Sequence, residues 1–375
     1  MLYPTFKIDK PIRLITLFSG YDSQALALKY LGVKFEHYKT CEWAVKSIQA
    51  LKDLHFENDN TNYSKNLTDD EVKEYLLEKG ISSNYNDPMS KEQIKRLKNH
   101  RQIYNNIQAT HNLVNIQQVK GKDLDIKDTD KFIYLLTYSF PCQDLSLAGN
   151  RKGMSDTSTR SGMLWEVERI LSELEEKPQV LLMENVPMIH STDNLEDFNK
   201  WQLRLEELGY KNYCQDLIAT DYGIPQTRNR TFMISILGDY NYTFPKPIPL
   251  KLKLKDMLED NVDKKYYIDN KELEFIKNNI KLDYINYVEY ERYNNHFEQN
   301  CRVWKDKVPS LHTANQQIKI FVKNNNKKGY LEATEGDCID LCQPNSKTRR
   351  GRVQKEKSQT ISTMGGEHLG VVVNE

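Results

Sequence analysis

The sequence predicts an α/β fold with a doubly wound, mostly parallel sheet and a smaller second domain at the C-terminal end. Apolar runs typical of buried strands alternate with amphipathic segments of helical length up to residue 240. Strands that alternate with such helices form βαβ units, and these units build parallel sheets. Beyond residue 240 a proline-rich stretch and then a tyrosine- and asparagine-rich stretch replace the alternation.

The expected strands are four apolar runs. They are 12–18 (IRLITLF), 132–140 (FIYLLTYSF), 178–186 (PQVLLMENV) and 231–238 (TFMISILG). The first three are each followed by a segment whose apolar residues recur at helical spacing: 22–32, 162–176 and 194–210. Gly32 is expected to end the first of these helices, because glycine favours helix C-termini.

Two features divide the chain. A polar, Asn- and Lys-rich stretch at 51–120 breaks the alternation, contains helix-like pieces and indicates an insertion on the surface of the sheet domain. The sequence PKPIP, which follows residue 244, marks a domain boundary. We therefore expect a sheet domain at 1–239 and a small domain at 240–375.

The C-terminal part contains an internal repeat at an offset of 50 residues. CRVWKDKVPSLHT (301–313) aligns with GRVQKEKSQTIST (351–363), and Arg302 matches Arg352. Two copies are too few for a solenoid, so we expect two similar strand–turn elements in one small subdomain.

Composition narrows the class of protein. The net charge of zero does not mark the whole chain as a binder of polyanions, although residues 301–375 hold 13 Lys and Arg against 8 Asp and Glu. No apolar window reaches the length of a membrane span, so we expect a soluble, intracellular protein. The six cysteines do not occur in regularly spaced pairs, which indicates reduced thiols and not a disulfide scaffold. Cys338 and Cys342 have metal-like spacing, but the second pair that a zinc site needs is missing.

Three residues of useful chemistry fall at or just beyond the ends of expected strands: Gly20, Cys142 and Glu184. In doubly wound sheets, ligands bind beyond the carboxyl ends of the strands. We therefore expect these three segments to converge on one crevice.

The chemistry of this crevice follows from the residue types. Cys142 stands in the polar turn PCQDLS, where a thiolate nucleophile is favoured, although packing is the alternative for a lone cysteine. Glu184 ends an apolar run, so its partly desolvated carboxyl can give or hold a proton. In QTRNR (226–230), Arg228 and Arg230 alternate before a strand and suit a carbonyl oxygen, a carboxylate or a phosphate.

A second group of residues indicates a ligand with hydroxyl groups. Gly20 in LFSGYDSQ lies in a strand-to-helix turn whose free backbone N–H groups can hold a polar ligand; a purely structural turn is the alternative. Glu42 in CEW is placed to accept hydrogen bonds from ribose hydroxyls, and a solvated carboxylate is the rival interpretation.

Six motifs in this order resemble those of the C5-cytosine DNA methyltransferases, across residues 12–238. They are LFSG (17–20), CEW (41–43), SFPCQDLS (139–146), RSGMLWEVERIL (160–171), LLMENV (181–186) and DYGIPQTRNRTFMI (221–234). The resemblance implies a Rossmann-like methyltransferase core followed by a target-recognition domain. It also implies catalysis on a cytosine rotated out of duplex DNA, at a cost of a few kcal/mol.

The resemblance assigns the catalytic roles. Cys142 is the nucleophile that attacks C6, and Glu184 engages N3 and the exocyclic amine. Arg230 holds cytosine O2, and Arg228 positions the loops of Glu184 and Cys142. Further contacts to the substrate or its loop are implied for Gln143, Ser146, Asn185 and Gln226.

The resemblance also implies S-adenosyl-L-methionine as the methyl donor. Phe18 would lie against the adenine, Gly20 beside the methionine part, Glu42 on the ribose and Trp43 next to it. Asp123, in GKDLDI, is the expected reader of the adenine amine, and Asp125 lies two residues on.

Two departures from the family pattern stand out. Asp22 occupies a position that is often glycine in the first motif. No segment resembles the family's last motif, a helix with GNS or GNA that completes the cofactor pocket. The missing motif leaves a non-catalytic DNA-binding relative as one alternative. A tRNA cytosine-5 methyltransferase, which uses the same catalytic set, is the other.

We expect double-stranded DNA as the partner, with the protein acting as a monomer in the cytoplasm of a bacterium, encoded by the cell or by a phage. A cognate restriction endonuclease or phage self-protection is the expected setting. Target recognition is expected between 240 and 350, and KTRRGR (347–352) is expected to contact DNA phosphates.

Overall fold

The computed structural model describes residues 3–141 and 161–257, together with shorter C-terminal segments. Those segments are 285–289, 302–304, 319–325, 330–334, 336–340, 351–358 and 369–371. Cys142, Gln143 and Ser146 lie outside the described residues. The chain forms two compact units. The first comprises Met1–Leu217 and Arg230–Pro245, and the second comprises Ile218–Asn229 and Lys246–Glu375.

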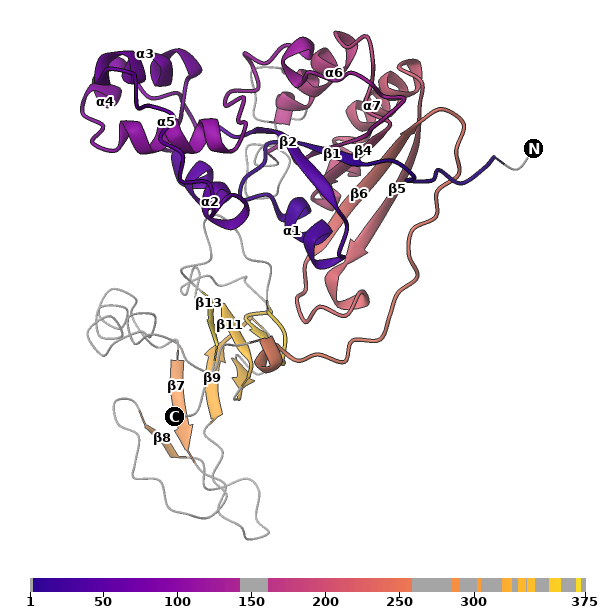
Figure 1. Ribbon diagram of the computed structural model, residues 1–375. Helices are drawn as coiled ribbons and strands as arrows, with labels where there is room; N and C mark the ends of the chain where they lie inside the picture. Colours follow the sequence, from indigo (N-terminus) through magenta and orange to yellow (C-terminus); the bar gives the residue numbers. More distant parts are fainter. Residues whose placement is uncertain are drawn as a thin grey trace. The chain divides into compact units, whose positions relative to one another are not determined.

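The first unit is built on a six-stranded sheet of order β2-β1-β3-β4-β6-β5 (Figure 1). The strands are β1 (Ile12–Leu17), β2 (Phe35–Cys41), β3 (Ile133–Tyr138), β4 (Val180–Asn185), β5 (Tyr210–Ile218) and β6 (Asn229–Leu237). Strands β1 to β4 pair in parallel, whereas β6 runs antiparallel to β4. The expected doubly wound, mostly parallel sheet is confirmed.

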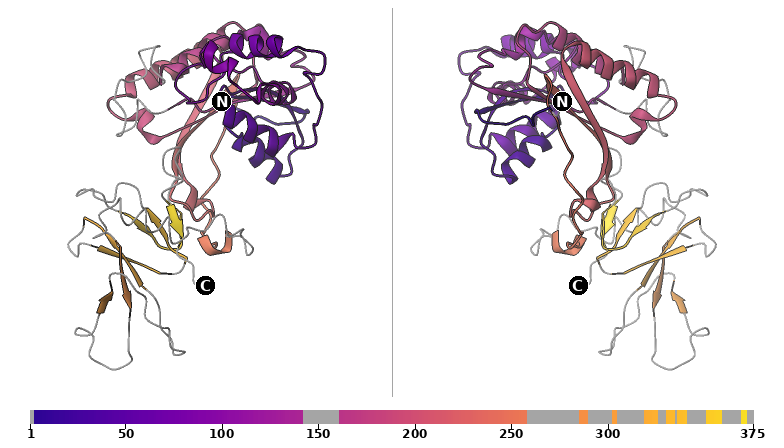
Figure 2. Two further views of the ribbon diagram at one scale, coloured as in Figure 1. Left: turned by 90° about the vertical axis from the view of Figure 1, so that its left-hand side faces the viewer. Right: turned by 90° about the vertical axis from the view of Figure 1, so that its right-hand side faces the viewer.

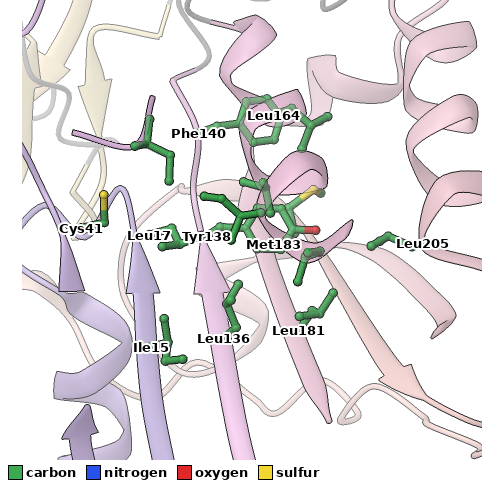
Figure 3. Packing of buried hydrophobic residues seen from close by; sticks show 14 of the residues in the cluster. Ile15, Leu17, Cys41, Leu136, Tyr138, Phe140, Leu164, Leu181, Met183 and Leu205 are labelled. Carbon is green, nitrogen blue, oxygen red and sulfur yellow. The ribbon is translucent and has the colours of Figure 1, made fainter. Parts of the chain in front are cut away.

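One face of this sheet packs against α6 (Leu164–Ser172) and α7 (Leu195–Glu207). Alternate residues of each strand point the same way, so one face of the sheet gathers apolar side chains from three parallel strands. In Figure 3 these side chains meet those of the two helices; the cluster includes Ile15, Leu17, Leu136, Tyr138, Leu181, Met183, Leu164 and Leu205. This core fixes the strand ends that carry the site.

The opposite face is covered at its β1 side by α1 (Ser23–Tyr30). Thr16, on this face of β1, donates to the Asp22 carboxylate, which also caps α1 by accepting from the Ala25 N–H. The side views in Figure 2 show indigo and pink helices on opposite sides of the strands. Gly32 follows the helix at φ +68°, as the sequence predicted.

The insertion expected at 51–120 is a helical subdomain. It holds α2 (Val45–His55), α3 (Asp69–Lys79), α4 (Lys91–Lys95) and α5 (His100–Ala109), and Figure 1 shows α3 to α5 gathered away from α6 and α7. Its own hydrophobic core comprises Ile48, Val72, Leu76, Ile81, Ile94, Ile103, Ile107 and Val114. A capping box of Thr68 and Glu71 starts α3, and Gly80 ends it at φ +66°. We call residues 45–109 the helical insertion.

The second unit contains short strands in two small sheets. The first has the order β10-β9-β7-β8 and the second the order β12-β11-β13. Their bounds are β7 (Ile285–Glu289), β8 (Arg302–Trp304), β9 (Lys319–Lys323), β10 (Tyr330–Ala333), β11 (Cys338–Asp340), β12 (Val353–Gln354) and β13 (Leu369–Val371). Both copies of the repeat therefore contribute a strand, β8 and β12, each beginning at or next to the matched arginine. In the described part of the chain, no helix has the length and apolarity to cross a bilayer.

The helical insertion is expected to depend on its own core. Leu76 is fully buried there, so Leu76→Ala should lower the free energy of unfolding by about 2–5 kcal/mol. Urea unfolding monitored by circular dichroism measures this change. The matched control is Leu203→Ala on α7, where the leucine is 57% exposed and a change within about 0.5 kcal/mol is expected. Equal losses in both variants would contradict the separate core.

Candidate active site and cofactor pocket

The turn after β1 has an unusual backbone. Phe18, Gly20 and Asp22 all have positive φ, at 56°, 56° and 58°. Glycine adopts this conformation freely, but for the other two residues it costs on the order of 1–3 kcal/mol each and persists only where surrounding contacts enforce it. A Cβ added to Gly20 would meet no atom within 4 Å, so space lies open in front of this glycine. Such strain concentrates where backbone groups face a ligand.

Glu42 is the carboxylate that faces this turn. It follows β2, is 9% exposed, and accepts from the Gly20 N–H at 2.9 Å and the Ala44 N–H at 2.7 Å. Burial raises the pKa of the Glu42 carboxyl, and the bonds from the backbone N–H groups oppose that rise. Each carboxylate oxygen can accept more than one hydrogen bond, so two hydroxyl donors fit here as well.

Asn112 holds Glu42 in place and was missed by the sequence analysis. Its Oδ1 accepts from the Glu42 N–H at 3.0 Å, and its Nδ2 donates to the Glu42 carbonyl at 2.9 Å. The chain returns from the helical insertion beside β2, where Leu113 donates its N–H to the Thr40 carbonyl. In the sequence, the asparagines near Asn112 look like part of the Asn-rich insertion. The point at which the chain returns to the sheet edge therefore has no visible signal.

The two aromatic residues expected at the cofactor, Trp43 and Phe18, pack against different hydrophobic cores. Trp43 packs against the core of the helical insertion, and its carbonyl accepts from the Ser82 N–H at 2.8 Å. Phe18 packs against the core of the sheet. The helical insertion and the sheet therefore each carry one of these aromatic side chains.

Asp123 takes a structural position. Its carboxylate accepts from the Lys120 N–H at 2.9 Å and caps the short 3-10 helix η1 (Gly121–Leu124). This element is tied to the C-terminal end of α6, where the Gly121 N–H donates to Glu173. Among the described residues no hydrogen bond links Asp123 to Gly20 or Glu42. Asn115 is 6% exposed and lies just beyond Asn112. It is therefore closer in the sequence than Asp123 to the residue that holds Glu42.

Glu184 and Asn185 end β4 and make separate contacts. Glu184 Oε1 lies 3.1 Å from Arg230 Nε, and both side chains are 17% exposed. Asn185 is buried, and its Nδ2 donates to the Phe140 carbonyl at 3.2 Å. Phe140 stands two residues before Cys142, so this bond fixes the approach of the chain to the expected nucleophile.

Gln226 and Arg228 belong to the second unit. There the Ser358 N–H donates to the Pro225 carbonyl at 2.7 Å, and the Thr227 N–H donates to the Ser358 carbonyl at 3.0 Å. The second copy of the repeat thus pairs with the loop of Gln226 and Arg228. The Arg228 carbonyl accepts from the Ala219 N–H, which closes the hairpin that carries this loop.

Of the basic residues in KTRRGR, which is expected to contribute phosphate contacts, Arg352 does not fit this role. Arg352 is 1% exposed, so its guanidinium is inside the second unit and not available to DNA. Residues 347–350 lie outside the described residues.

The family description "C-5 cytosine-specific DNA methylase" matches residues 78–364, which is more than half of the chain. The chain belongs to this family. As a C-5 cytosine DNA methylase it is an enzyme that methylates cytosine in DNA and takes the methyl group from S-adenosylmethionine.

Curated relatives agree with this membership. The methylase is similar to the orphan methyltransferase M.SssI of Spiroplasma monobiae, with 33% identity over 331 residues, 85% of this chain and 84% of the relative. It is 36% identical over 273 residues to the type II methyltransferase M2.ScrFI of Lactococcus lactis subsp. cremoris, covering 70% and 71% of the two chains. A shorter match, 36% over 162 residues, links it to M.HhaI of Haemophilus parahaemolyticus.

The turn and the carboxylate fit S-adenosylmethionine. The open space at Gly20 admits a close approach to the backbone, and the buried Glu42 carboxylate can accept from the hydroxyls of a ribose. Trp43 beside it offers an apolar, aromatic surface. These residues would bind and orient the cofactor, which supplies the methyl group when it is bound.

Glu42→Gln should weaken S-adenosylmethionine binding between about tenfold and a hundredfold, because a hydrogen bond to a charged group contributes roughly 1.5–3 kcal/mol. Calorimetric titration measures the dissociation constant. Because the pKa of Glu42 is raised, wild-type affinity should also fall on acidification earlier than for an exposed carboxyl, and the variant should lack this component. Glu36→Gln, on β2 with a side chain 52% exposed, is the control and should bind normally. Loss of affinity in the control alone would reject the assignment of Glu42.

Proposed function

We propose that this DNA (cytosine-5) methyltransferase uses Cys142 as its nucleophile and the Glu184–Arg230 pair as the polar partner of the target base. The ion pair at 3.1 Å carries this proposal, because it sets a carboxylate and a guanidinium together at the end of β4. Asn185 supports it by bonding the segment that leads to Cys142.

The proposed reaction begins when the Cys142 thiolate adds to C6 of a cytosine extruded from the duplex. The addition places negative charge on the ring. Glu184 enters this step as a protonated carboxyl that is still in contact with Arg230, and it passes its proton to N3 so that this charge is neutralised. Arg230 donates to cytosine O2 and holds the Glu184 side chain by the same guanidinium. C5 would then take the methyl group that S-adenosylmethionine supplies, and the demethylated thioether would be the leaving group. A base removes the C5 proton, the Cys142 thiolate leaves C6 as the C5–C6 double bond re-forms, and N3 returns its proton to Glu184.

The remaining roles concern the DNA around the target base and the division of the chain. Gln226 and Arg228 would act from the loop that Ser358 holds, and Gln143 and Ser146 would contact the DNA near the target base. Residues 1–239 would form the catalytic domain and 240–375 the target-recognition region. The type II names of several relatives support a restriction–modification setting. Protection of phage DNA is the alternative setting, and we propose that the protein acts as a monomer on double-stranded DNA.

Covalent trapping tests the catalytic proposal. The protein, incubated with S-adenosylmethionine and duplexes that contain 5-fluorocytosine, should form an adduct of reduced gel mobility, because fluorine at C5 blocks the release step. Cys142→Ser should abolish the adduct, whereas Cys214→Ser, at an exposed thiol of β5, should leave it unchanged. An adduct that survives in the Cys142→Ser variant would rule out this nucleophile.

A salt titration tests the proposed phosphate contacts of Lys347, Arg349 and Arg350. Replacing all three by glutamine should lower duplex affinity and flatten the plot of log affinity against log salt by about 0.9 per lost contact. The control replaces Lys73, Lys91 and Lys95 of the helical insertion by glutamine, which changes the net charge equally. An unchanged slope in the first variant, or an equal change in the control, would reject these contacts.

A further inference from the structure

Asp22, where the family pattern often has glycine, lies at the centre of a buried hydrogen-bond network. Its side chain is fully buried, and Oδ1 caps α1 by accepting from the Ala25 N–H at 3.0 Å. Oδ2 accepts from Thr16 Oγ1 at 3.0 Å and lies 2.6 Å from His37 Nε2. The carboxylate therefore joins β1, α1 and β2 at the end of the cofactor turn.

Thr16 extends this network back into the turn. Its hydroxyl lies 2.9 Å from Ser19 Oγ, which accepts from the Cys41 N–H at 3.1 Å. The Ser19 N–H donates to the Cys41 carbonyl at 3.0 Å. Ser19 directly precedes Gly20, and Cys41 directly precedes Glu42, so the network ties together the two segments that meet in the cofactor site.

His37 is the partner that a buried Asp22 requires. An ionised carboxylate can only accept, so Nε2 of His37 carries the hydrogen of this bond. The ring stacks on Phe56, with centroids 4.9 Å apart, and its side chain is 9% exposed. A buried carboxylate oxygen that loses its hydrogen-bond donor is left without compensation for its burial, and turning toward water restores a donor. That movement would release the backbone at Asp22.

A second histidine holds the same turn from the helical insertion. His55, at the end of α2, has Nε2 2.8 Å from the Tyr21 carbonyl, and its ring centroid lies 5.3 Å from that of His37. A carbonyl also only accepts, so Nε2 of His55 is the donor. The turn is thus held at two consecutive residues, by His55 at the Tyr21 carbonyl and by His37 at the Asp22 carboxylate.

We propose that His37 is a positioning residue of the methyl-transfer reaction, which acts through Asp22 to hold Phe18, Gly20 and Asp22 in their positive-φ conformation for S-adenosylmethionine. Without this grip the turn relaxes toward ordinary backbone angles, and the Gly20 N–H leaves the Glu42 carboxylate. The cofactor must then reorder the turn when it binds. Affinity for the cofactor falls, while the chemical step at saturating cofactor is retained. This inference rests on the assignment of the Gly20 turn to the cofactor.

His37→Gln tests the proposal by the split between binding and turnover. The dissociation constant and the KM for S-adenosylmethionine should rise about tenfold, and kcat at saturating cofactor should stay within about twofold. The control is His190→Gln, which removes another histidine–carboxylate pair, with Asp216 at 2.9 Å, that does not contact the turn. Its cofactor affinity should match the wild type. A fall in kcat with an unchanged dissociation constant would overturn the proposal.

A double-mutant cycle with Asp22→Gly separates positioning from general destabilisation. Glycine accepts φ +58° without strain, so this variant keeps the turn accessible and loses the network. It should weaken cofactor binding by itself, and adding His37→Gln should change affinity less than twofold further. Independent, multiplying effects would mean that His37 acts elsewhere.

The folded state and the cofactor assignment are checked separately. Thermal unfolding identifies variants that fail to fold; should His37→Gln fail, Asp22→Asn removes the charge that His37 serves and should weaken binding to the same extent, and normal binding in that variant would overturn the proposal. Wild-type protein that binds no S-adenosylmethionine would refute the assignment of the Gly20 turn. Wild-type binding with equal affinity in the His37→Gln variant would refute the positioning role alone.

Discussion

The part of the site that fits the cofactor depends on one buried carboxylate, that of Glu42. Burying a charge is costly unless hydrogen bonds compensate it, and Glu42 is compensated by two backbone N–H groups from separate turns. This arrangement requires β1 and β2 to lie side by side, in parallel, with their ends at one edge. It also requires Asn112 to bring the end of the helical insertion back to that edge.

The catalytic half depends on the direction of one strand. Because β6 runs antiparallel to β4, the residues that begin β6 lie at the end of β4. Arg230 therefore meets Glu184, although 46 positions separate them in the chain. A parallel β6 would have placed the arginine at the far edge of the sheet. The antiparallel pairing thus brings the start of β6 to the ion pair that we propose for catalysis.

The residues of this site could be predicted from the sequence more readily than the residues and strand directions that hold them in place. Apolar runs located four of the strands because buried strands are continuous in apolar residues, and the ends of those runs located Gly20 and Glu184. The antiparallel direction of β6 could not be predicted, since direction depends on tertiary pairing. Asn112 was also hidden, because a side chain that bonds a backbone 70 residues away leaves no local pattern. Arg352 looked like a surface cation by composition but is buried.

The helical insertion has a core of its own; the chain enters and leaves it near Ala44 and Asn112, and His55 connects it to the turn at Tyr21. Such a unit can open as a local cooperative block, with its amides exchanging with solvent, while the sheet stays folded. Each opening would strip Trp43 of its packing. A cofactor that binds only the closed form therefore makes this block harder to open, by an amount that grows with cofactor concentration. Bound cofactor would then slow both amide exchange and proteolytic cleavage within residues 45–109.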